Sequence, residues 1–245
     1  MTDINLTVAL TAHAETVIAG PTMASAESAI ATAEAAGITV ERLIGFDNAT
    51  PECKAYFSAP AFDLWNSAEF NFRDQGKTRN ELAKVAKGKW LAFLDGDDLF
   101  SENWLLEAVR RIQISGNEKT IVHPEVNWIF DAHGAVIVKP AQNDPLFTPY
   151  YFYMGNYYDA LCLAPRTAWI EHPYADREIS RGFAYEDWQW NIETMEAGWI
   201  HVVAKDTLIF KRRRDSSQTT ESSKSKASIR NIDEIAIDRI CYLNN

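Results

Sequence analysis

Three aspartates are crowded into four positions at the end of an apolar run. Residues 90–94 are Trp-Leu-Ala-Phe-Leu, and Asp95, Asp97 and Asp98 follow directly. Such a run predicts a strand buried on both faces of a parallel sheet, where ligand sites lie at the carboxyl ends of the strands. Crowded, partly dehydrated carboxylates repel one another and need a cation. Oxygen ligands of this kind suit Mg²⁺ or Mn²⁺, which commonly bridge carboxylates to substrate phosphates.

The same four residues have a simpler interpretation. Asp-Gly-Asp after a strand is ordinary turn chemistry, because Asp and Gly tolerate the backbone dihedral angles of tight turns. Residues 95–98 alone therefore leave two interpretations open, a solvated turn and a turn that holds a metal and a diphosphate. The surrounding pattern favours the second interpretation.

A second acidic pair, Glu186 and Asp187, begins an expected helix over residues 186–197. A hydroxyl is a poor nucleophile at neutral pH, and a carboxylate that takes its proton contributes roughly 10²–10⁴-fold to the rate. The alternative is that the pair only favours the helix dipole, since acidic residues are common in the first turn of a helix.

Composition limits the class of protein. The chain has 245 residues, 47% of them hydrophobic, and a net charge of −10, which indicates a folded domain and argues against a nucleic-acid-binding surface. No apolar run approaches the roughly 20 residues that span a bilayer, and the N-terminus lacks the basic region of a secretory signal. Cys53, Cys162 and Cys241 form neither a disulfide framework nor a zinc pattern, which is typical of reduced thiols in a cytoplasmic protein.

The elements that must position these carboxylates alternate between strand and helix in the first half of the chain. Strands are expected over residues 5–12, 38–46, 68–72 and 90–94, and helices over 22–36, 78–87 and 102–114. Ser101 is expected to cap the last of these helices. The alternation predicts a parallel, doubly wound sheet.

The second half of the chain has a different pattern. Strands are expected over residues 120–129, 135–138, 159–165, 199–204 and 207–212, with the helix 186–197 among them. Residues 215–227 are polar and are expected to be mobile. Isoleucines at helical spacing over residues 228–242 predict a C-terminal helix.

Taken in this order, the motifs resemble those of family-2 glycosyltransferases, which have the GT-A fold. The resemblance covers roughly residues 5–217 and is strongest over 88–98, Gly-Lys-Trp-Leu-Ala-Phe-Leu-Asp-Gly-Asp-Asp. It implies one α/β domain over residues 1–245, with a Rossmann-like, doubly wound mixed sheet that is mainly parallel and flanked by helices. The implied parts are a nucleotide-sugar-binding half, an acceptor-binding half, and a mobile segment with a C-terminal helix, over residues 1–115, 116–217 and 218–245.

The resemblance also implies roles for the residues of the strand ends. Asp95 would face the ribose or the sugar of the donor, and Asp97 would be the principal ligand of the metal. Thr11 and Glu15 match the nucleotide-binding loop of the family, although the usual Pro-Thr-Tyr-Asn run is only partly kept. Asp47 stands where the family has an Asp-Asp-Gly-Ser turn, and would accept a hydrogen bond from the base.

Three basic residues are assigned to the nucleotide sugar. Lys77 and Arg79 lie at the start of an expected helix, in a segment that resembles the Gly…Ala-Arg-Asn segment of the family, and a helix N-terminus favours an anion. Their alternative is a capped and solvated helix turn. Arg214 stands at the histidine of the family's Arg-x-His-x-x-Ser pattern, which Arg212 and Ser217 match.

Arg214 departs from the family in its chemistry. A guanidinium is permanently protonated and does not readily ligate a metal, but it can neutralise a leaving diphosphate through bidentate contacts. The alternatives are a solvated basic strand end and a patch that meets an acidic membrane surface. On the acceptor side, the resemblance makes Asp187 the general base and Glu186 an acceptor contact. Trp188 is assigned to the acceptor as well, although such a ring more often packs in the core.

The expected function is that of a metal-dependent, inverting glycosyltransferase. It would use Mn²⁺ or Mg²⁺ and move a sugar from a nucleoside diphosphate sugar, with a UDP-sugar expected, to a hydroxyl of a glycan or lipid-linked glycan. By analogy with the family, the role is bacterial surface polysaccharide synthesis, in the cytoplasm or peripherally at the inner face of the membrane. The alternatives are a sugar nucleotidyltransferase, whose Gly-rich basic loop residues 10–21 lack, and a non-catalytic domain of the same fold that binds nucleotide sugars or glycans.

Overall fold

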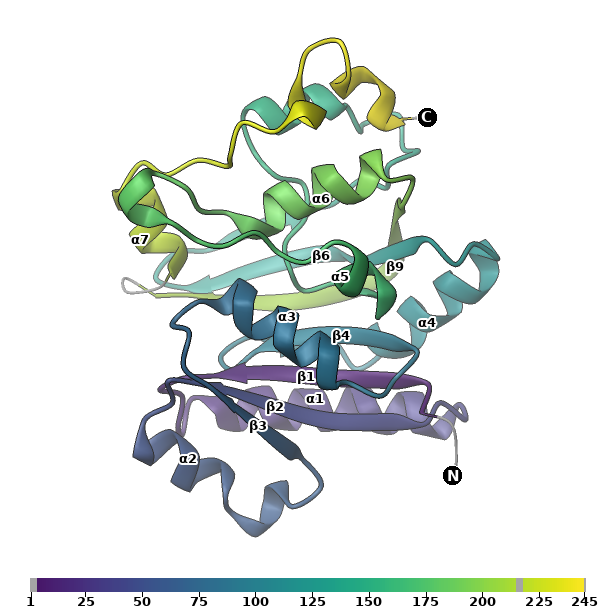
Figure 1. Cartoon of the computed structure of the whole chain (residues 1–245). Coiled ribbons are helices and arrows are strands. Elements are labelled where there is room, and N and C mark those ends of the chain that lie inside the picture. Colours follow the sequence, from purple (N-terminus) through teal and green to yellow (C-terminus); the bar gives the residue numbers. More distant parts are fainter. Residues whose placement is uncertain (1–3, 215–217, 245) are drawn as a thin grey trace.

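One mixed sheet runs through the whole molecule. The computed structural model describes residues 4–214 and 218–244. Within them, nine strands form a single sheet in the order β3-β2-β1-β4-β8-β6-β9-β5, and β7 pairs with β6 outside this path (Figure 1). The strands are β1 (Leu6–Ala12), β2 (Val40–Asp47), β3 (Asn66–Phe70), β4 (Trp90–Asp95), β5 (Leu99–Phe100), β6 (Thr120–Asp131), β7 (Ala135–Val138), β8 (Leu163–Pro165) and β9 (Ile200–Arg213).

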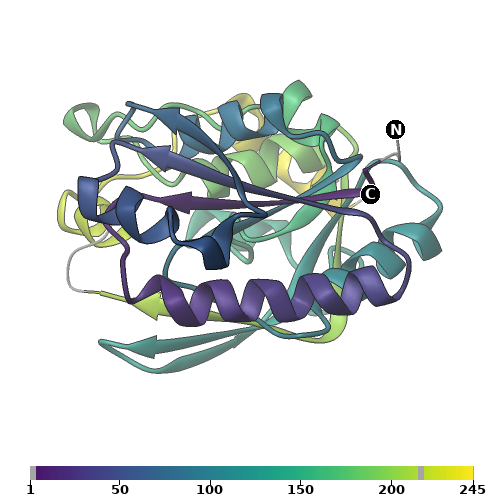
Figure 2. The ribbon, with the colours of Figure 1, turned by 90° about the horizontal axis from the view of Figure 1, so that it is seen from below.

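Helices alternate with these strands. The α-helices are α1 (Ala19–Ala35), α2 (Pro51–Phe57), α3 (Gln75–Val85), α4 (Trp104–Ser115), α5 (Thr167–Glu171), α6 (Glu186–Glu196) and α7 (Gln218–Lys224). Short 3₁₀ helices are η1 (Pro60–Phe62), η2 (Pro149–Tyr153), η3 (Ile179–Arg181), η4 (Asp233–Ile235) and η5 (Ile240–Asn244). Helix α1 contacts α4 on one face of the sheet, and α3 contacts α5 on the other (Figure 2).

The first half of the sheet is parallel, as its sequence predicts. β1 lies between β2 and β4 and pairs with both in parallel, so that Leu10 stands beside Ile44 and Leu94. Every residue of β1 is buried, which explains its continuous apolar pattern. β6 and β9 form a further parallel pair, while β8 joins the two halves through antiparallel pairing with β4 and β6. The α/β class and the mixed, mainly parallel sheet flanked by helices are therefore confirmed.

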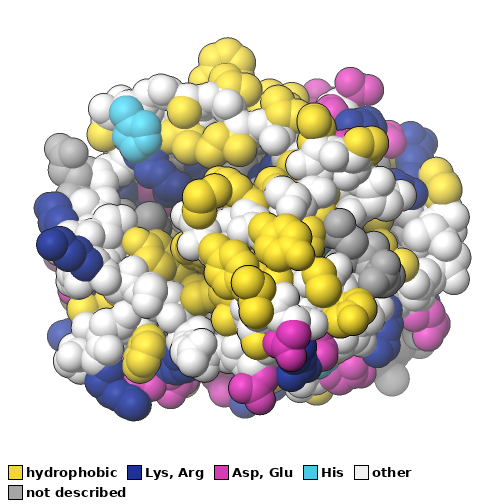
Figure 3. All heavy atoms as spheres, turned by 90° about the horizontal axis from the view of Figure 1, so that it is seen from above, with side chains coloured by type: hydrophobic (Ala, Val, Ile, Leu, Met, Phe, Trp, Pro, Cys, Tyr) yellow, Lys and Arg dark blue, Asp and Glu magenta, His cyan; other side chains and the backbone are white. Residues whose placement is uncertain are grey.

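Two hydrophobic cores support this sheet. The larger core surrounds β1 and β4, and the smaller one joins α6 to η2 and η5 through Phe152, Ile192 and Ile240. Hydrophobic side chains also gather on the surface when the molecule is viewed from above (Figure 3). Met154 and Ile237, from the segments around the smaller core, are among the exposed hydrophobic residues of the molecule.

The prediction of a C-terminal helix over residues 228–242 is wrong. In this region the structure has only η4 and η5, with a bend and a turn at residues 236–239 between them. The isoleucines instead pack singly against the smaller core, with Ile240 fully buried, and so tertiary packing overrides the helical spacing. The stretch expected to be mobile, 215–227, contains α7, and its residues 215–217 lie outside the described part of the chain.

Two local expectations also differ from the structure. The strands expected over 199–204 and 207–212 form one strand, β9, with a register shift against β6 between Pro124 and Val126. Ser101 does not cap α4; its hydroxyl binds Asn103 Oδ1 and accepts the backbone N–H of Leu208. No helix in residues 4–214 and 218–244 is both long and apolar enough to cross a membrane.

The entry into β4 gives a test of this packing. A Cβ on Gly88 would lie 2.4 Å from the backbone N of Thr7 and 2.6 Å from the carbonyl carbon of Leu6, so neither atom can move without shifting β1. We expect Gly88→Ala to lower the free energy of unfolding. Overpacking costs about 1–3 kcal/mol, and we expect a value toward the upper end of that range. Urea denaturation measures it.

Gly134 provides the matched control, because a Cβ there would meet no atom closer than 3.9 Å. We expect Gly134→Ala to leave the urea midpoint nearly unchanged. Equal midpoints for the two variants would contradict the close approach of residue 88 to β1.

Candidate active site

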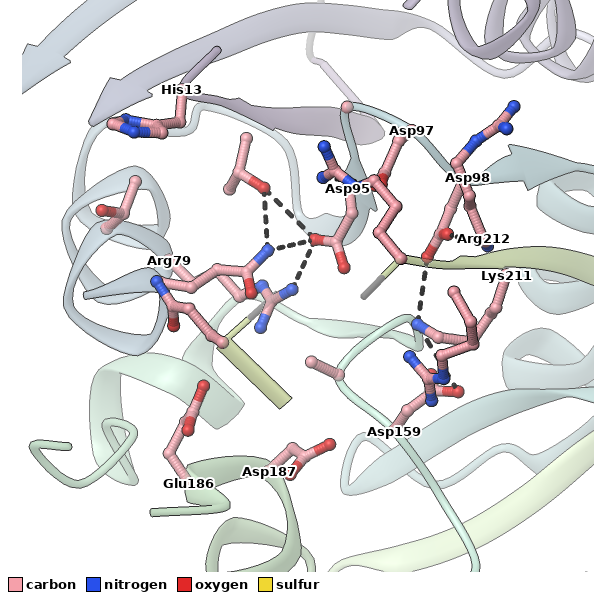
Figure 4. A pocket seen from close by; sticks show the side chains of 18 of the residues that line it. His13, Arg79, Asp95, Asp97, Asp98, Asp159, Glu186, Asp187, Lys211 and Arg212 are labelled. Carbon is pink, nitrogen blue, oxygen red and sulfur yellow. Dashed lines mark hydrogen bonds and ion pairs between the residues drawn. The ribbon is translucent and has the colours of Figure 1, made fainter. Parts of the chain in front are cut away.

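The acidic turn opens into a cavity of about 980 Å³. The carboxyl ends of β1, β2 and β4 line one side of the cavity, together with the first turn of α3. The first turn of α6 and the end of β9 complete the wall. Glu186 and Asp187 lie across the cavity from Asp95 and Asp97 (Figure 4). The two acidic motifs of the sequence therefore meet in one site.

Asp95 is held by a network of neutral and charged donors. Its Oδ1 lies 2.5 Å from a terminal nitrogen of Arg79 and accepts hydrogen bonds from Gln75 Nε2 at 2.6 Å and Thr11 Oγ1 at 3.2 Å. Burial alone would raise the pKa of Asp95, but Arg79 and then Lys211 outweigh it and hold this pKa below its ordinary value. Asp95 is therefore a fixed anion at the floor of the cavity.

Asp98 is paired with a different cation. Its Oδ2 lies 3.0 Å from Lys211 Nζ, and its Oδ1 accepts the backbone N–H of Arg212 at 2.7 Å. Lys211 also lies 4.0 Å from Asp159, which in turn pairs with the buried Lys139 at 3.4 Å. This chain of alternating charges ties the acidic turn to β9 and to the segment before β8, so Asp98 anchors the turn.

Asp97 is paired with Arg214. Its Oδ2 lies 2.7 Å from a terminal nitrogen of Arg214, and the same nitrogen lies 3.2 Å from Oε1 of Glu15. The other Glu15 oxygen accepts the backbone N–H groups of His13, at 2.7 Å, and Ala14, at 3.1 Å. Burial and then Asp98 raise the pKa of Asp97 to about 7 against the opposing charge of Arg214. One guanidinium thus bridges β9 to the loop after β1 and to the acidic turn.

The side chains do not form the Mn²⁺ or Mg²⁺ site expected at Asp97. Enzymes of family 2 with the GT-A fold commonly depend on a divalent metal, which needs oxygen or imidazole ligands. Here Arg214 pairs with both Asp97 and Glu15, and a guanidinium has no lone pair to offer a metal. Within residues 4–214 and 218–244, no group of three or more His, Cys, Asp or Glu side chains could hold a metal ion.

The carboxylates at the start of α6, Glu186 and Asp187, have no paired cation at contact distance among the described residues. In the described part of the chain, the one hydrogen bond to the Asp187 carboxylate is donated by the backbone N–H of Trp188, at 2.8 Å. Burial, then Glu186 and then Asp159 raise the pKa of Asp187 to about 7. Burial also raises the pKa of Glu186 above its ordinary value. A carboxyl group whose pKa lies near neutrality is suited to accept a proton from a hydroxyl.

Most of the residues expected from the sequence line the cavity. They are Thr11, Glu15, Asp47, Arg79, Asp95, Asp97, Glu186, Asp187, Trp188 and Arg214. Trp188 has a second environment as well, because it packs against the smaller core. Arg79 is almost fully buried, so it holds Asp95 and is not a solvated helix turn.

Two expected residues have other surroundings. Lys77 does not line the cavity, and its Nζ lies 3.2 Å from Asp176 on the surface. Asp47 lines the cavity, but both its oxygens accept backbone N–H groups of residues 72–74, at 2.6–3.1 Å. Its carboxylate therefore fixes the loop before α3. The sequence predicts a different role, the acceptance of a hydrogen bond from the base.

Sequence reasoning missed several residues of the site. Gln75 bonds Asp95, Lys211 pairs with Asp98, and Asp159 joins Lys211 to Lys139. Lys211 stood in the basic run at the end of β9, and that run was the available signal. Gln75 directly precedes the segment that contains Lys77 and Arg79, but Asp159 lies beside no motif, and only the folding of the chain brings it to the acidic turn.

Comparisons with known proteins found a partial sequence match and a shared fold. Residues 67–134 match the sequence model of the family described as glycosyl transferase family 2, a stretch that contains the acidic turn and Arg79. A search of curated proteins found no match.

Solved structures of TarS from S. aureus share the fold. One, of residues 1–349 in complex with UDP-GlcNAc, has a TM-score of 0.62 and 13% identity, over 88% of this chain and 60% of that chain. Another, in complex with UDP, has a TM-score of 0.58 and 14% identity, over 86% of this chain and 61% of that chain. The chain thus spans about 60% of the length of these TarS chains. Residues 67–134 are thus similar to glycosyl transferase family 2, and the chain as a whole shares the fold of these TarS structures.

Proposed function

We propose that the protein transfers a sugar from a nucleoside diphosphate sugar to an acceptor hydroxyl, with inversion at the anomeric carbon. One observation carries most of the weight. Asp187, with a pKa of about 7, lies across the cavity from Asp95, whose pKa is held low. Two carboxyl groups with opposite environments in one cavity are what a proton acceptor and a fixed binding anion require.

The donor would occupy the side of the cavity formed by β1, β2 and β4. Parallel strands bind nucleotides beyond their carboxyl ends, which is where Thr11 and Asp95 lie. A UDP-sugar is the donor that we propose, and its support is the likeness in fold to TarS structures that contain UDP-GlcNAc and UDP. A cavity of about 980 Å³ lies within the range of ligand sites in proteins.

The reaction would proceed in one displacement. The acceptor oxygen forms a bond to the anomeric carbon while the bond from that carbon to the diphosphate oxygen breaks. The proton of the acceptor hydroxyl passes to the carboxylate of Asp187, and the electron pair of the broken bond leaves with the nucleoside diphosphate. Asp187 must be ionised at the start, so its raised pKa makes it a stronger base than an ordinary aspartate.

The acceptor would enter beside the first turn of α6. Tyr157 and Trp188 line this part of the cavity, and aromatic rings of this kind pack well against apolar faces of sugars. A hydroxyl of a glycan, such as a growing surface polysaccharide, is the acceptor that we propose.

Donor binding can be tested by thermal denaturation with a panel of nucleotides. We expect UDP and UDP-sugars to raise the unfolding temperature, because a ligand of the folded state at 100 times its Kd adds about 2.7 kcal/mol to stability. UMP, which lacks the second phosphate, should give a smaller shift. Unchanged unfolding temperatures with every nucleoside diphosphate and nucleotide sugar would contradict the donor site.

The base can be tested by Asp187→Asn. We expect the transfer rate to fall by roughly 10²–10⁴-fold, because the amide cannot accept the proton, while UDP binding stays as in the unmodified protein. Asp63→Asn, at an exposed residue outside the cavity, is the matched control and should leave both unchanged. An Asp187→Asn protein with full activity would assign the base to another residue.

The pH dependence of the same protein gives a further test. Because Asp187 acts in its ionised form, the transfer rate should rise as pH increases through about 7 and level off above it. Stability should change in the opposite sense, since the raised pKa means that the folded state binds a proton the unfolded state has released. Asp187→Asn should therefore raise the unfolding temperature more at pH values above 7 than near pH 5. A pH of 5 is about one unit above the pKa of an ordinary aspartate. A rate that falls with pH across this range would count against Asp187 as the base.

A further inference from the structure

We infer that Arg214 supplies the cation beside Asp97, so that the nucleoside diphosphate binds and leaves without a divalent metal. The inference rests on the proposed function and specifies which group in the donor site supplies the positive charge for the diphosphate. Arg214 lies 2.7 Å from Asp97 and 3.2 Å from Glu15, between the end of β4 and the loop after β1. This is the position where the acidic turn was expected to present its ligand to a metal.

Each aspartate of the turn already contacts a protein cation. Asp95 pairs with Arg79, Asp98 with Lys211, and Asp97 with Arg214. Glu15 shares Arg214 with Asp97 and accepts two backbone N–H groups besides. A divalent ion at Asp97 would come close to the guanidinium charge and would have to displace it from both carboxylates.

The three cations differ in what they can reach. The side chain of Arg79 is 4% exposed and that of Lys211 is 9% exposed, and each lies within its own ion pair. All three line the cavity, but the side chain of Arg214 is 37% exposed. Of these three cations, Arg214 is therefore the one placed to contact a bound diphosphate.

A guanidinium is chemically suited to this task. It carries five N–H donors in a plane and binds phosphate oxygens through paired hydrogen bonds, and its charge persists at every working pH. Both ion pairs of Arg214 use one terminal nitrogen, NH2. Donors fixed in advance beside a developing negative charge stabilise it without reorganisation, which is the role otherwise given to a metal.

The test measures UDP binding by titration calorimetry to the whole chain, once in EDTA and once in Mn²⁺. For the unmodified protein we expect the same affinity in both, within about twofold, and equal transfer rates in both. Arg214→Ala should weaken UDP binding by about 10–100-fold, the value of hydrogen bonds to a charged group. Its binding of uridine, which has no phosphate, should be unchanged.

A second variant gives a signature that a merely structural role of Arg214 would not produce. Arg214→His replaces the guanidinium by an imidazole, which can ligate a metal beside Asp97 when neutral. We expect this variant to bind UDP weakly in EDTA and to recover at least part of the lost affinity in Mn²⁺. Arg110→Ala, at an exposed arginine paired with Glu107 and outside the cavity, controls for the loss of a surface charge and should bind UDP normally.

The outcomes separate this inference from the proposed function. UDP binding by the unmodified protein that requires Mn²⁺, with Arg214→Ala binding equally well, would overturn the role of Arg214 and leave the glycosyltransferase proposal standing. Binding of no nucleotide under either condition would overturn both. Each variant is compared with the unmodified protein by its unfolding temperature first, and Arg214→His serves if Arg214→Ala does not fold.

Discussion

The burial of carboxylates at one edge of the sheet is the constraint on which the rest of this structure depends. An unpaired buried charge carries a penalty of several kcal/mol, so each acidic side chain of the turn must meet a cation or a set of donors. Arg79 comes from α3, Lys211 comes from the end of β9, and Arg214 directly follows β9. The sheet order places β9 between β5 and β6, and this position brings cations that compensate the buried charge of the acidic turn.

The two sides of the cavity satisfy this constraint in different ways. On the side of β4, ion pairs and hydrogen bonds fix the carboxylates, and Asp95 is held as an anion. At the start of α6, Asp187 has no cation at contact distance in the described part of the chain, and its pKa rises to about 7. Fixed charges suit binding and an unpaired carboxyl suits proton transfer, so the ion-pair pattern supports the proposed division of the cavity into a donor side and an acceptor side.

Local pattern was sufficient for most of the fold. The buried strands β1 and β4 and the helices between them follow from apolar periodicity and from Gly and Asp at their ends, because each of these signals acts over a few residues. The C-terminal segment is the counterexample. Ile229, Ile232 and Ile235 have helical spacing, yet they pack one by one on the smaller core. Contacts with distant side chains, which no short window of sequence contains, outweighed that spacing.

The sequence by itself determined the two acidic motifs of the candidate site, since a strand followed by Asp95 and Asp97 and a helix that begins with Glu186 and Asp187 are local features. Only the tertiary structure decided which cation meets which carboxylate. Lys77 and Arg79 are two residues apart on α3, yet Arg79 pairs with Asp95 in the cavity while Lys77 meets Asp176 at the surface. Such pairing depends on which face of a helix is turned inward and on the path of β9 through the sheet. Both are set by the packing of the whole chain.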